Sequence, residues 1–181
     1  MNSGLKLGLM SVAAGLALQA GNADAAVAQH LFRANAVNYC QAFTPGPANT
    51  IRNRVVGSEN VGATMNVACN FHTLTNGAAG VTPPTSLTVY FANNNASGSL
   101  TVTCALLTGY QGQGSSYIVT KTTGAINAGG VSQAFLTWNA ADNPVQPATN
   151  LGNYFIGINC TLPTGAVIND TYLYWNMDNG V

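Results

Sequence analysis

The amino-acid sequence predicts an all-β protein: a single domain built as a two-sheet antiparallel β-sandwich and held by two disulfides. Three observations support this prediction. Short segments alternate apolar with polar or small residues at a period of two, as in a strand with one buried face. Turn-forming residues separate these segments at short intervals. The chain has four cysteines, an even number, and three of them lie on the apolar faces of such segments.

The N-terminus predicts export. Lys6 supplies a positive charge, residues 7–18 are apolar and uncharged, and the run Ala23-Asp24-Ala25 carries small residues where a signal peptidase reads the chain. The apolar run of about 12 residues is shorter than the roughly 20 that a membrane-spanning helix needs. We therefore expect a signal peptide over 1–25. Cleavage after Ala25 leaves residues 26–181, or 181 − 25 = 156 residues, as one domain that is secreted, periplasmic or displayed at the cell surface.

Charge in the processed chain is sparse and balanced. Four basic and four acidic residues oppose each other: Arg33, Arg52, Arg54 and Lys121 against Glu59, Asp142, Asp170 and Asp178. A nucleic-acid-binding protein needs a basic patch that displaces counterions from phosphate, and this chain has none in its sequence. The same scarcity of charge disfavours binding to anionic membranes. No later hydrophobic stretch is long enough to span a bilayer, so we expect no transmembrane segment after processing.

Two disulfides are expected, because an exported chain meets an oxidising compartment. The cysteines involved are Cys40, Cys69, Cys104 and Cys160. Of the three possible pairings we predict Cys40–Cys69 and Cys104–Cys160. The thiols point inward from their strands, so we expect bridges that cross the core between the two sheets. Zinc is the competing use of these residues, but there is no C-x-x-C pair, and His30 and His72 are not at ligand spacing.

Alternation and turn chemistry give the positions of the strands. We predict strands over 65–71, 87–91, 100–106, 117–121, 135–138, 154–162 and 171–175, with weaker candidates at 37–43 and 54–56. Turn-formers lie between them, at 44–47, 76–77, 93–95, 112–114, 129–130 and 163–165. This spacing is typical of a sandwich or a barrel, and a single sandwich is the simpler arrangement for 156 residues. No capped amphipathic helix is found, although a short helical turn fits within 139–153.

The sequence carries no strong catalytic, metal or cofactor motif. The chain lacks a G-x-S-x-G elbow, and the segment 112–116 lacks the third glycine of a dinucleotide fingerprint. Calcium ligands at Asp142 or Asp178 do not follow an EF-hand spacing. We therefore predict no catalytic residue, no metal and no cofactor. The alternative is a secreted hydrolase whose acids converge only in the fold.

Aromatic residues near the C-terminus are the candidate binding residues. In a strand over 171–175, Tyr172 and Tyr174 share one face and Leu173 and Trp175 share the other. If the second pair is core, the tyrosines are exposed, where they can stack on sugar rings or form a protein interface. The alternative is that these rings only cover a sheet face. Two further tyrosines flank the glycine-rich loop, Tyr110 and Tyr117.

Several fragments resemble small exported Gram-negative β-sandwich proteins that have no assigned function. They are the alanine-rich leader, the cysteine-bearing segments 67–69 and 102–104, and the run 160–165. The resemblance implies a bacterial origin and transfers no catalytic residue. A more distant resemblance is to the chaperone–usher pilins, although these usually have a penultimate tyrosine and this chain ends at 179–181 with Asn-Gly-Val.

The sequence therefore predicts an exported, non-enzymatic binding or structural module. Its expected partner is a second copy or another surface protein, and a carbohydrate ligand is the alternative. We also expect residues 27–33 to form an extended arm that pairs with the sheet edge of a neighbouring molecule.

Overall fold

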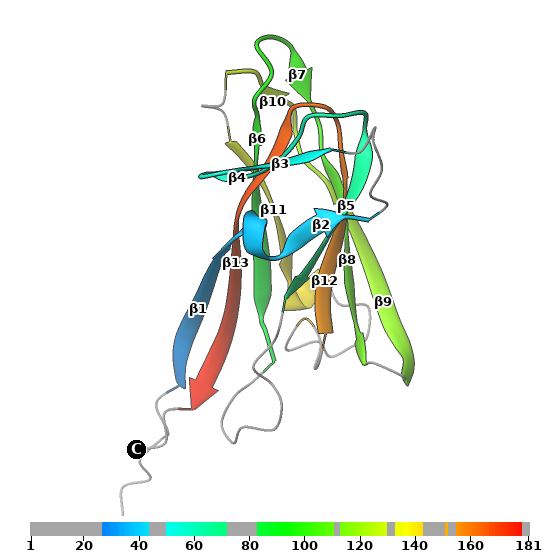
Figure 1. The fold of residues 1–181 in the computed structure, drawn as a ribbon. Coiled ribbons are helices and arrows are strands. Elements are labelled where there is room, and N and C mark those ends of the chain that lie inside the picture. Colours follow the sequence, from blue (N-terminus) through cyan, green and yellow to red (C-terminus); the bar gives the residue numbers. More distant parts are fainter. Residues whose placement is uncertain are drawn as a thin grey trace, which may run out of the picture.

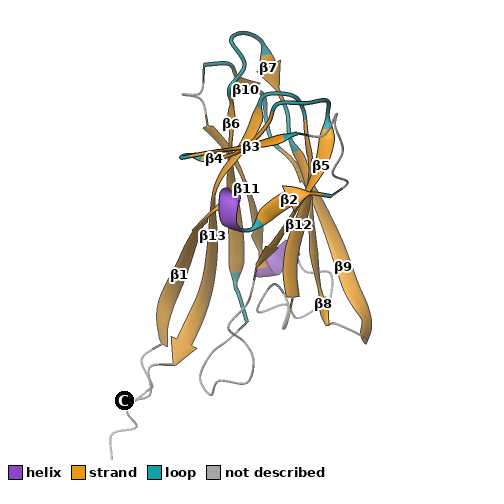
Figure 2. Ribbon diagram, in the orientation of Figure 1, coloured by secondary structure: helices purple, strands orange, loops and turns teal. Residues whose placement is uncertain are grey.

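The computed structural model describes residues 27–43, 50–71, 83–110, 113–129, 133–142, 151 and 155–178. In these ranges the chain is all-β, with two antiparallel sheets that face each other as a single sandwich, so the predicted fold class is confirmed (Figure 2). Two 3₁₀ turns, Ala36–Asn38 and Ala140–Asp142, interrupt the strands, and the second lies where a helical turn is expected. No helix in the described part of the chain is long and apolar enough to cross a membrane.

The first sheet has six strands arranged around the long strand β13. Its order is β11-β6-β13-β4-β3, and β1 pairs with β13 beside this path. The N-terminal half of β13 pairs with β4 and its C-terminal half with β1. Both neighbours therefore lie on the same side of β13, one after the other along its length (Figure 1). The strands are β1 (Val27–Asn35), β3 (Ile51–Arg54), β4 (Gly57–Asn60), β6 (Ser86–Asn93), β11 (Gln133–Asn139) and β13 (Ala166–Asp178).

The second sheet has five strands in the order β2-β5-β12-β8-β9. They are β2 (Cys40–Ala42), β5 (Met65–Phe71), β8 (Thr103–Tyr110), β9 (Gln113–Thr122) and β12 (Phe155–Leu162). A separate pair of two-residue strands, β7 (Ser99–Leu100) and β10 (Ile126–Asn127), lies at one end of the sandwich (Figure 1). Each of the seven segments predicted as strands contributes to a strand of the structure.

Three segments depart from the sequence-based expectation. Of residues 54–56, predicted as a strand, only Arg54 lies in one, at the end of β3; Val55 and Val56 form the turn of the β3–β4 hairpin, where they are 97% and 60% exposed. The segment 37–43 is divided between a 3₁₀ turn and the short strand β2. Residues 27–33 do not extend toward a neighbour, because β1 pairs with β13 of its own chain along nine consecutive residues.

Alternating side chains from both sheets fill the core. The largest fully buried side chains include Phe91, Leu106, Ile158 and Trp138. Trp138 of β11 also joins the sheets through a polar contact, because its indole Nε1 donates a hydrogen bond to the carbonyl of Val119 in β9 at 3.0 Å. A buried indole N–H needs such an acceptor, and here the acceptor lies on the opposite sheet.

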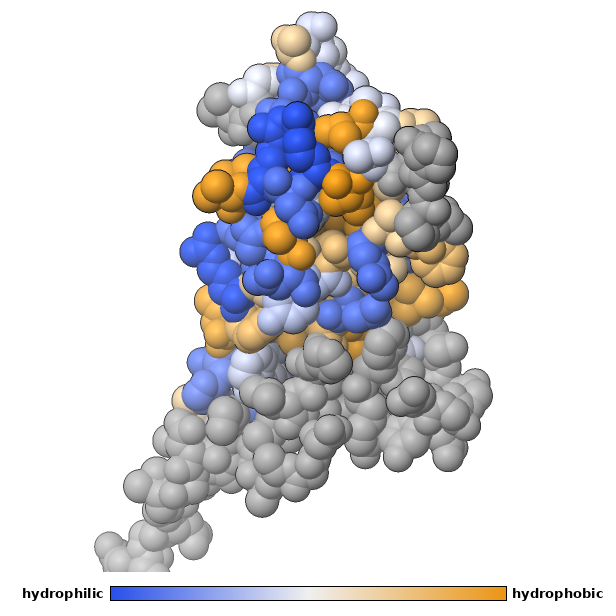
Figure 3. Space-filling view, in the orientation of Figure 1, coloured by the Kyte–Doolittle hydropathy of each residue, from blue (hydrophilic) through white to orange (hydrophobic). Residues whose placement is uncertain are grey.

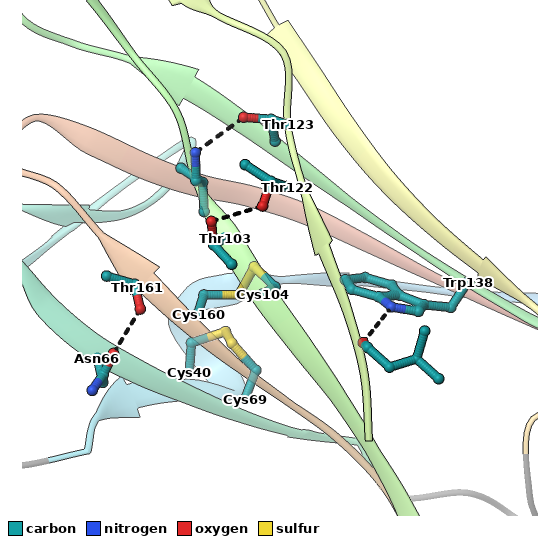
Figure 4. Close-up of a disulfide and its surroundings, with 12 residues drawn as sticks. Cys40, Asn66, Cys69, Thr103, Cys104, Thr122, Thr123, Trp138, Cys160 and Thr161 are labelled. Carbon is teal, nitrogen blue, oxygen red and sulfur yellow. Dashed lines mark hydrogen bonds between the residues drawn. A yellow bond between two sulfur atoms is a disulfide. The ribbon is translucent and has the colours of Figure 1, made fainter. Parts of the chain in front are cut away.

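The disulfides have the predicted pairing but not the predicted location. Cys40 and Cys69 face each other on the neighbouring strands β2 and β5, and Cys104 faces Cys160 on β8 and β12 (Figure 4). Both bridges therefore lie within the five-stranded sheet, and the expected inter-sheet bridges are wrong. The physical reason is register: each cysteine lies directly opposite its partner on the neighbouring strand, where opposed side chains are close enough to form a disulfide. The Cα–Cα distance is 4.0 Å in both bridges.

Two buried asparagines hold the ends of strands in place. Asn60 Oδ1 accepts from the amide of Gly62 at 2.9 Å, and its Nδ2 donates to the carbonyl of Leu162 at 2.8 Å. Asn93 does the same at the end of β6, with the amide of Asn95 at 3.0 Å and the carbonyl of Ile126 at 2.9 Å. Each amide thus closes a local turn and ties it to a distant segment, which satisfies its buried polar atoms.

Removing either disulfide is expected to lower the free energy of unfolding by about 3–4 kcal/mol through loop-closure entropy. The C104A/C160A variant should lose about 0.5 kcal/mol more than C40A/C69A, because its bridge spans 56 residues of sequence rather than 29. Urea denaturation of the two double variants measures both values. Double variants as stable as the wild type would contradict this account of the sheet.

Candidate binding face

The outer face of the six-stranded sheet carries the residues that the sequence singled out. Leu173 of β13 is 2% exposed and points into the core, whereas Tyr172 and Tyr174 point outward and are half-buried. Trp175, expected on the core face, is half-buried and stacks on His30 of β1 with 6.1 Å between ring centroids. His30 Nε2 and Trp175 Nε1 are both buried without a hydrogen-bond partner in the described structure. A binding role for the two tyrosines stays a prediction.

Four adjacent strands align aromatic rings and one guanidinium on this face. Phe135 of β11 lies 5.7 Å from Tyr90 of β6, and Tyr90 lies 5.1 Å from Tyr172 of β13, measured between ring centroids. The guanidinium carbon of Arg33 in β1 lies 5.2 Å from the centroid of the Tyr172 ring, a cation–π distance. We call these four side chains the aromatic row. The row exists because strand register places Phe135 opposite Tyr90 and Arg33 opposite Tyr172.

Large apolar side chains extend the same face. Phe135 is 61% exposed, and Leu31 of β1 is 51% exposed. Leu31 lies directly opposite Tyr174 in the β1–β13 ladder, next to the Arg33–Tyr172 pair. Isolated exposed apolar residues are ordinary on a protein surface, but here they adjoin a row of rings on one sheet. The face is therefore the strongest candidate contact surface in the described structure.

The charge in the aromatic row is compensated. Arg33 pairs with Asp170 of β13, with 2.6 Å between the guanidinium Nη2 and the carboxylate Oδ2. This hydrogen bond and the charge of Asp170 raise the pKa of Arg33, so the guanidinium remains protonated. The contact also orients the guanidinium over the Tyr172 ring. The row thus presents rings and a neutral ion pair rather than a net charge.

Hydroxyl groups lie beside the rings. Thr88 and Thr137 are opposite each other on β6 and β11, and their hydroxyl oxygens are 2.9 Å apart. Each is two residues from a ring of the row, on the same strand face as Tyr90 and Phe135 respectively. The face therefore combines apolar rings with neutral hydrogen-bonding groups.

The opposite outer face, on the five-stranded sheet, is different in character. Asn66, Thr161, Thr103 and Thr122 occupy matching positions on four neighbouring strands. The Thr161 hydroxyl donates to Asn66 Oδ1 at 2.9 Å, and the Thr103 and Thr122 hydroxyls are 2.9 Å apart (Figure 4). These polar groups satisfy one another across the strands. On the side of the molecule shown in Figure 3, hydrophilic and hydrophobic residues are interspersed over the described surface.

Glu59 of β4 is a buried carboxylate with three donors. It is 3% exposed, and it accepts hydrogen bonds from Arg52, Arg54 and Asn94. Burial would raise the pKa of Glu59, but the hydrogen bonds from Asn94 and the two arginines outweigh burial and hold the pKa below its ordinary value. A general acid of a glycosidase requires the opposite direction of shift. Glu59 therefore joins the β3–β4 hairpin to the end of β6, and its negative charge has a structural role.

The other described carboxylates also have their own cations. Asp142 accepts from Lys121 Nζ and from the amide of Asn139, both at 2.8 Å. Burial opposes the shift, yet these two contacts lower the pKa of Asp142. Asp170 is engaged by Arg33. None of the described carboxylates belongs to a group of three or more His, Cys, Asp or Glu residues that could hold a metal ion.

Several sequence candidates lie outside the described residues. They are His72, the calcium candidates at 143 and 179, and the side chains of Tyr110, Ser115, Ser116, Tyr117 and Asp178.

Sequence reasoning missed three members of the aromatic row: Phe135, Tyr90 and Arg33. Alternation in 87–91 and 135–138 does place Tyr90 and Phe135 opposite the core residues of their strands. Only the register between strands shows that they are neighbours.

Glu59→Gln is expected to lower the free energy of unfolding by about 1–3 kcal/mol at pH 7, because a charged acceptor of four hydrogen bonds from three side chains is lost. Since folding lowers the pKa of Glu59, its contribution is fully present above the ordinary pKa of 4.5 and disappears as the pH falls through the folded-state pKa. Urea denaturation at pH 7 and pH 3 measures the free energies of unfolding of the wild type and of Glu59→Gln, and the difference between them should be smaller at pH 3. Asp170→Asn, at an exposed ion pair, should cost less than about 1 kcal/mol. If wild type and Glu59→Gln differed in stability as much at pH 3 as at pH 7, the structural role of the ionised Glu59 carboxylate would be contradicted.

Comparisons with known proteins give two remote structural similarities. No protein-family profile matches the chain, and no curated protein matches it. A solved structure described as "CBM4 structure and function" is 11% identical, with a TM-score of 0.31, and the alignment covers 79% of this chain and 81% of the other. The enzymatically active domain of tailspike protein 4 from bacteriophage CBA120 is 15% identical, with a TM-score of 0.29, over 82% of this chain and 19% of the tailspike chain. Similarities of this size establish neither a family nor a function.

Proposed function

We propose that the processed chain is an exported, non-catalytic binding module that contacts its partner through the aromatic row. One observation supports this proposal above the others: register across β11, β6, β13 and β1 gathers three rings and a compensated guanidinium on one exposed sheet face. The side chains project from strands rather than loops, so their spacing is fixed before a partner arrives. A preorganised surface of this kind loses little conformational entropy on binding.

A protein surface is the proposed partner. Tyr, Phe and Arg are enriched at protein interfaces, and Tyr and Arg are typical of the few residues that dominate their affinity. The most exposed ring, Phe135, stands at one end of the row and Leu31 adjoins the other end, which gives an extended apolar strip across the sheet. Because Arg33 is neutralised by Asp170, its burial under a partner leaves no uncompensated charge.

A neutral glycan is the second candidate. The Thr88–Thr137 hydroxyl pair beside the Tyr90 and Phe135 rings is the specific observation that favours it. Sugar rings stack their apolar faces on aromatic side chains while their hydroxyls bond to neutral polar groups. The charged residues of the row cancel, which suits an uncharged ligand.

Export is part of the same proposal. The leader with Lys6, the apolar run and the Ala23-Asp24-Ala25 site support it, as do two disulfides in the folded chain. β1, the first strand in the described part of the chain, begins at Val27, so cleavage after Ala25 would leave every described strand intact. The bacterial origin and the resemblance to small exported Gram-negative proteins also remain proposals.

N-terminal sequencing of the protein recovered outside the cytoplasm is expected to begin at Ala26. An Ala25→Leu variant should accumulate as the full-length precursor, because a signal peptidase requires a small residue at this position. Intact-mass measurement of both proteins checks the result. Wild-type protein that retains residues 1–25 outside the cytoplasm would refute the signal peptide.

The F135A/Y172A variant is expected to lose at least about tenfold in affinity for its partner, because loss of two of the three rings at a contact typically costs more than 1 kcal/mol. The measurement is binding of fluorescently labelled processed protein to intact cells of the producing organism. Ile118→Ala is a matched control, because Ile118 is 62% exposed on the other sheet, against 61% for Phe135.

Treatment of the cells distinguishes the two candidates. Binding that protease abolishes and periodate leaves intact supports a protein partner, and the reverse supports a glycan. Equal binding by wild type and F135A/Y172A, or equal loss in the Ile118→Ala control, would refute the aromatic row as the contact surface.

A further inference from the structure

Strand edges are the remaining surface with unsatisfied binding capacity. An edge strand exposes a row of backbone N–H and C=O groups that can pair with another strand, and proteins normally protect such edges. In the described structure five strands border the two main sheets: β1, β3 and β11 in the first, β2 and β9 in the second.

Four of these edges carry a recognised form of protection. β2 has only three residues, and β3 carries Arg52 and Arg54. β9 and β11 are tied to each other across the sandwich. Trp138 Nε1 donates to the Val119 carbonyl at 3.0 Å, and Lys121 Nζ donates to the Thr137 carbonyl at 2.7 Å. Short length, charge and covering contacts are the devices that prevent association at an edge.

β1 lacks these protections. It has nine residues, its register with β13 is unbroken from Val27 to Asn35, and its sequence contains neither Pro nor Lys. Its one formal charge, Arg33, is directed to Asp170 on its own sheet. Its middle residue, Leu31, is apolar and 51% exposed. A long, regular edge whose single charge is compensated has the properties that strand addition requires.

We propose that two copies of the chain pair through this edge, with their β1 strands antiparallel about a two-fold axis. Full overlap of nine residues places Leu31 opposite the partner's Leu31, at the midpoint of the strand. Arg33 then faces the partner's Gln29, and no two like charges face each other. The strand is therefore self-complementary in the antiparallel orientation, which is the property that a symmetric dimer interface requires.

The dimer fits the geometry of the sheet. At the level of β1 the first sheet runs β11-β6-β13-β1, so pairing of two copies yields a continuous sheet of eight strands. Sheets of this size are common. Pairing uses the edge of β1 and leaves the outer face open, so two aromatic rows would lie on one continuous surface. The inference goes beyond the proposed function and does not depend on it.

The test is the oligomeric state of the processed protein. Sedimentation velocity over a concentration series is expected to show a monomer–dimer equilibrium. Leu31→Lys should weaken the dimer by at least about tenfold, because two lysines would face each other at the axis. Phe135→Lys is the matched control: it places the same charge at an apolar position on another edge strand that is 61% exposed, against 51% for Leu31, and it should leave the dimer unchanged.

A second variant tests the register. Leu31→Cys should form a covalent dimer on mild oxidation, because directly opposed residues of an antiparallel pair are within disulfide distance, whereas Ile118→Cys should not. Circular dichroism checks that each variant is folded. A wild type that is monomeric at all concentrations, a dimer insensitive to Leu31→Lys, or equal cross-linking at both cysteine positions would overturn the proposal. Loss of partner binding in F135A/Y172A with an intact dimer separates this result from the proposed function.

Discussion

Strand β13 pairs with β1, β4 and β6, three segments that are distant in sequence, and the rest of the six-stranded sheet depends on this pairing. Its register determines that Arg33 lies over Tyr172 and that Leu31 lies beside Tyr174. It also brings the β3–β4 hairpin close to the end of β6, where Glu59 meets Asn94. Gly57 permits the close approach: its φ is +148°, and a Cβ there would collide with the carbonyl of Ile168.

The few charged residues of the chain form ion pairs with one another. Each carboxylate with a described side chain is bound by a cation on another strand or segment: Glu59 by Arg52 and Arg54, Asp142 by Lys121, and Asp170 by Arg33. These pairs join β3 to β4, β1 to β13, and β9 to the 3₁₀ turn that follows β11. The surface that remains is largely neutral, and recognition there depends on rings, hydroxyls and backbone groups.

The sequence predicted what depends on local alternation and left open what depends on register. Alternation around Leu173 correctly placed Tyr172 on the outer face, and the cysteines were paired correctly. The bridges were placed between sheets because a sequence does not state which strands are neighbours. The segment Gly57–Asn60 has the composition of a loop, yet it is a buried strand, because long-range pairing with β13 and the ion pairs of Glu59 outweigh its weak strand propensity. The same dependence on register explains why Phe135 and Tyr90 were not predicted as partners of Tyr172.

Both disulfides belong to one sheet, so the two halves of the sandwich differ mechanically. In the five-stranded sheet, covalent links join β2 to β5 and β8 to β12, and these strands cannot separate under load without breaking a bond. The described part of the six-stranded sheet has only hydrogen bonds and side-chain contacts between its strands. Covalent cross-links are therefore confined to the sheet opposite the aromatic row, and the described strands that carry the row are joined without them.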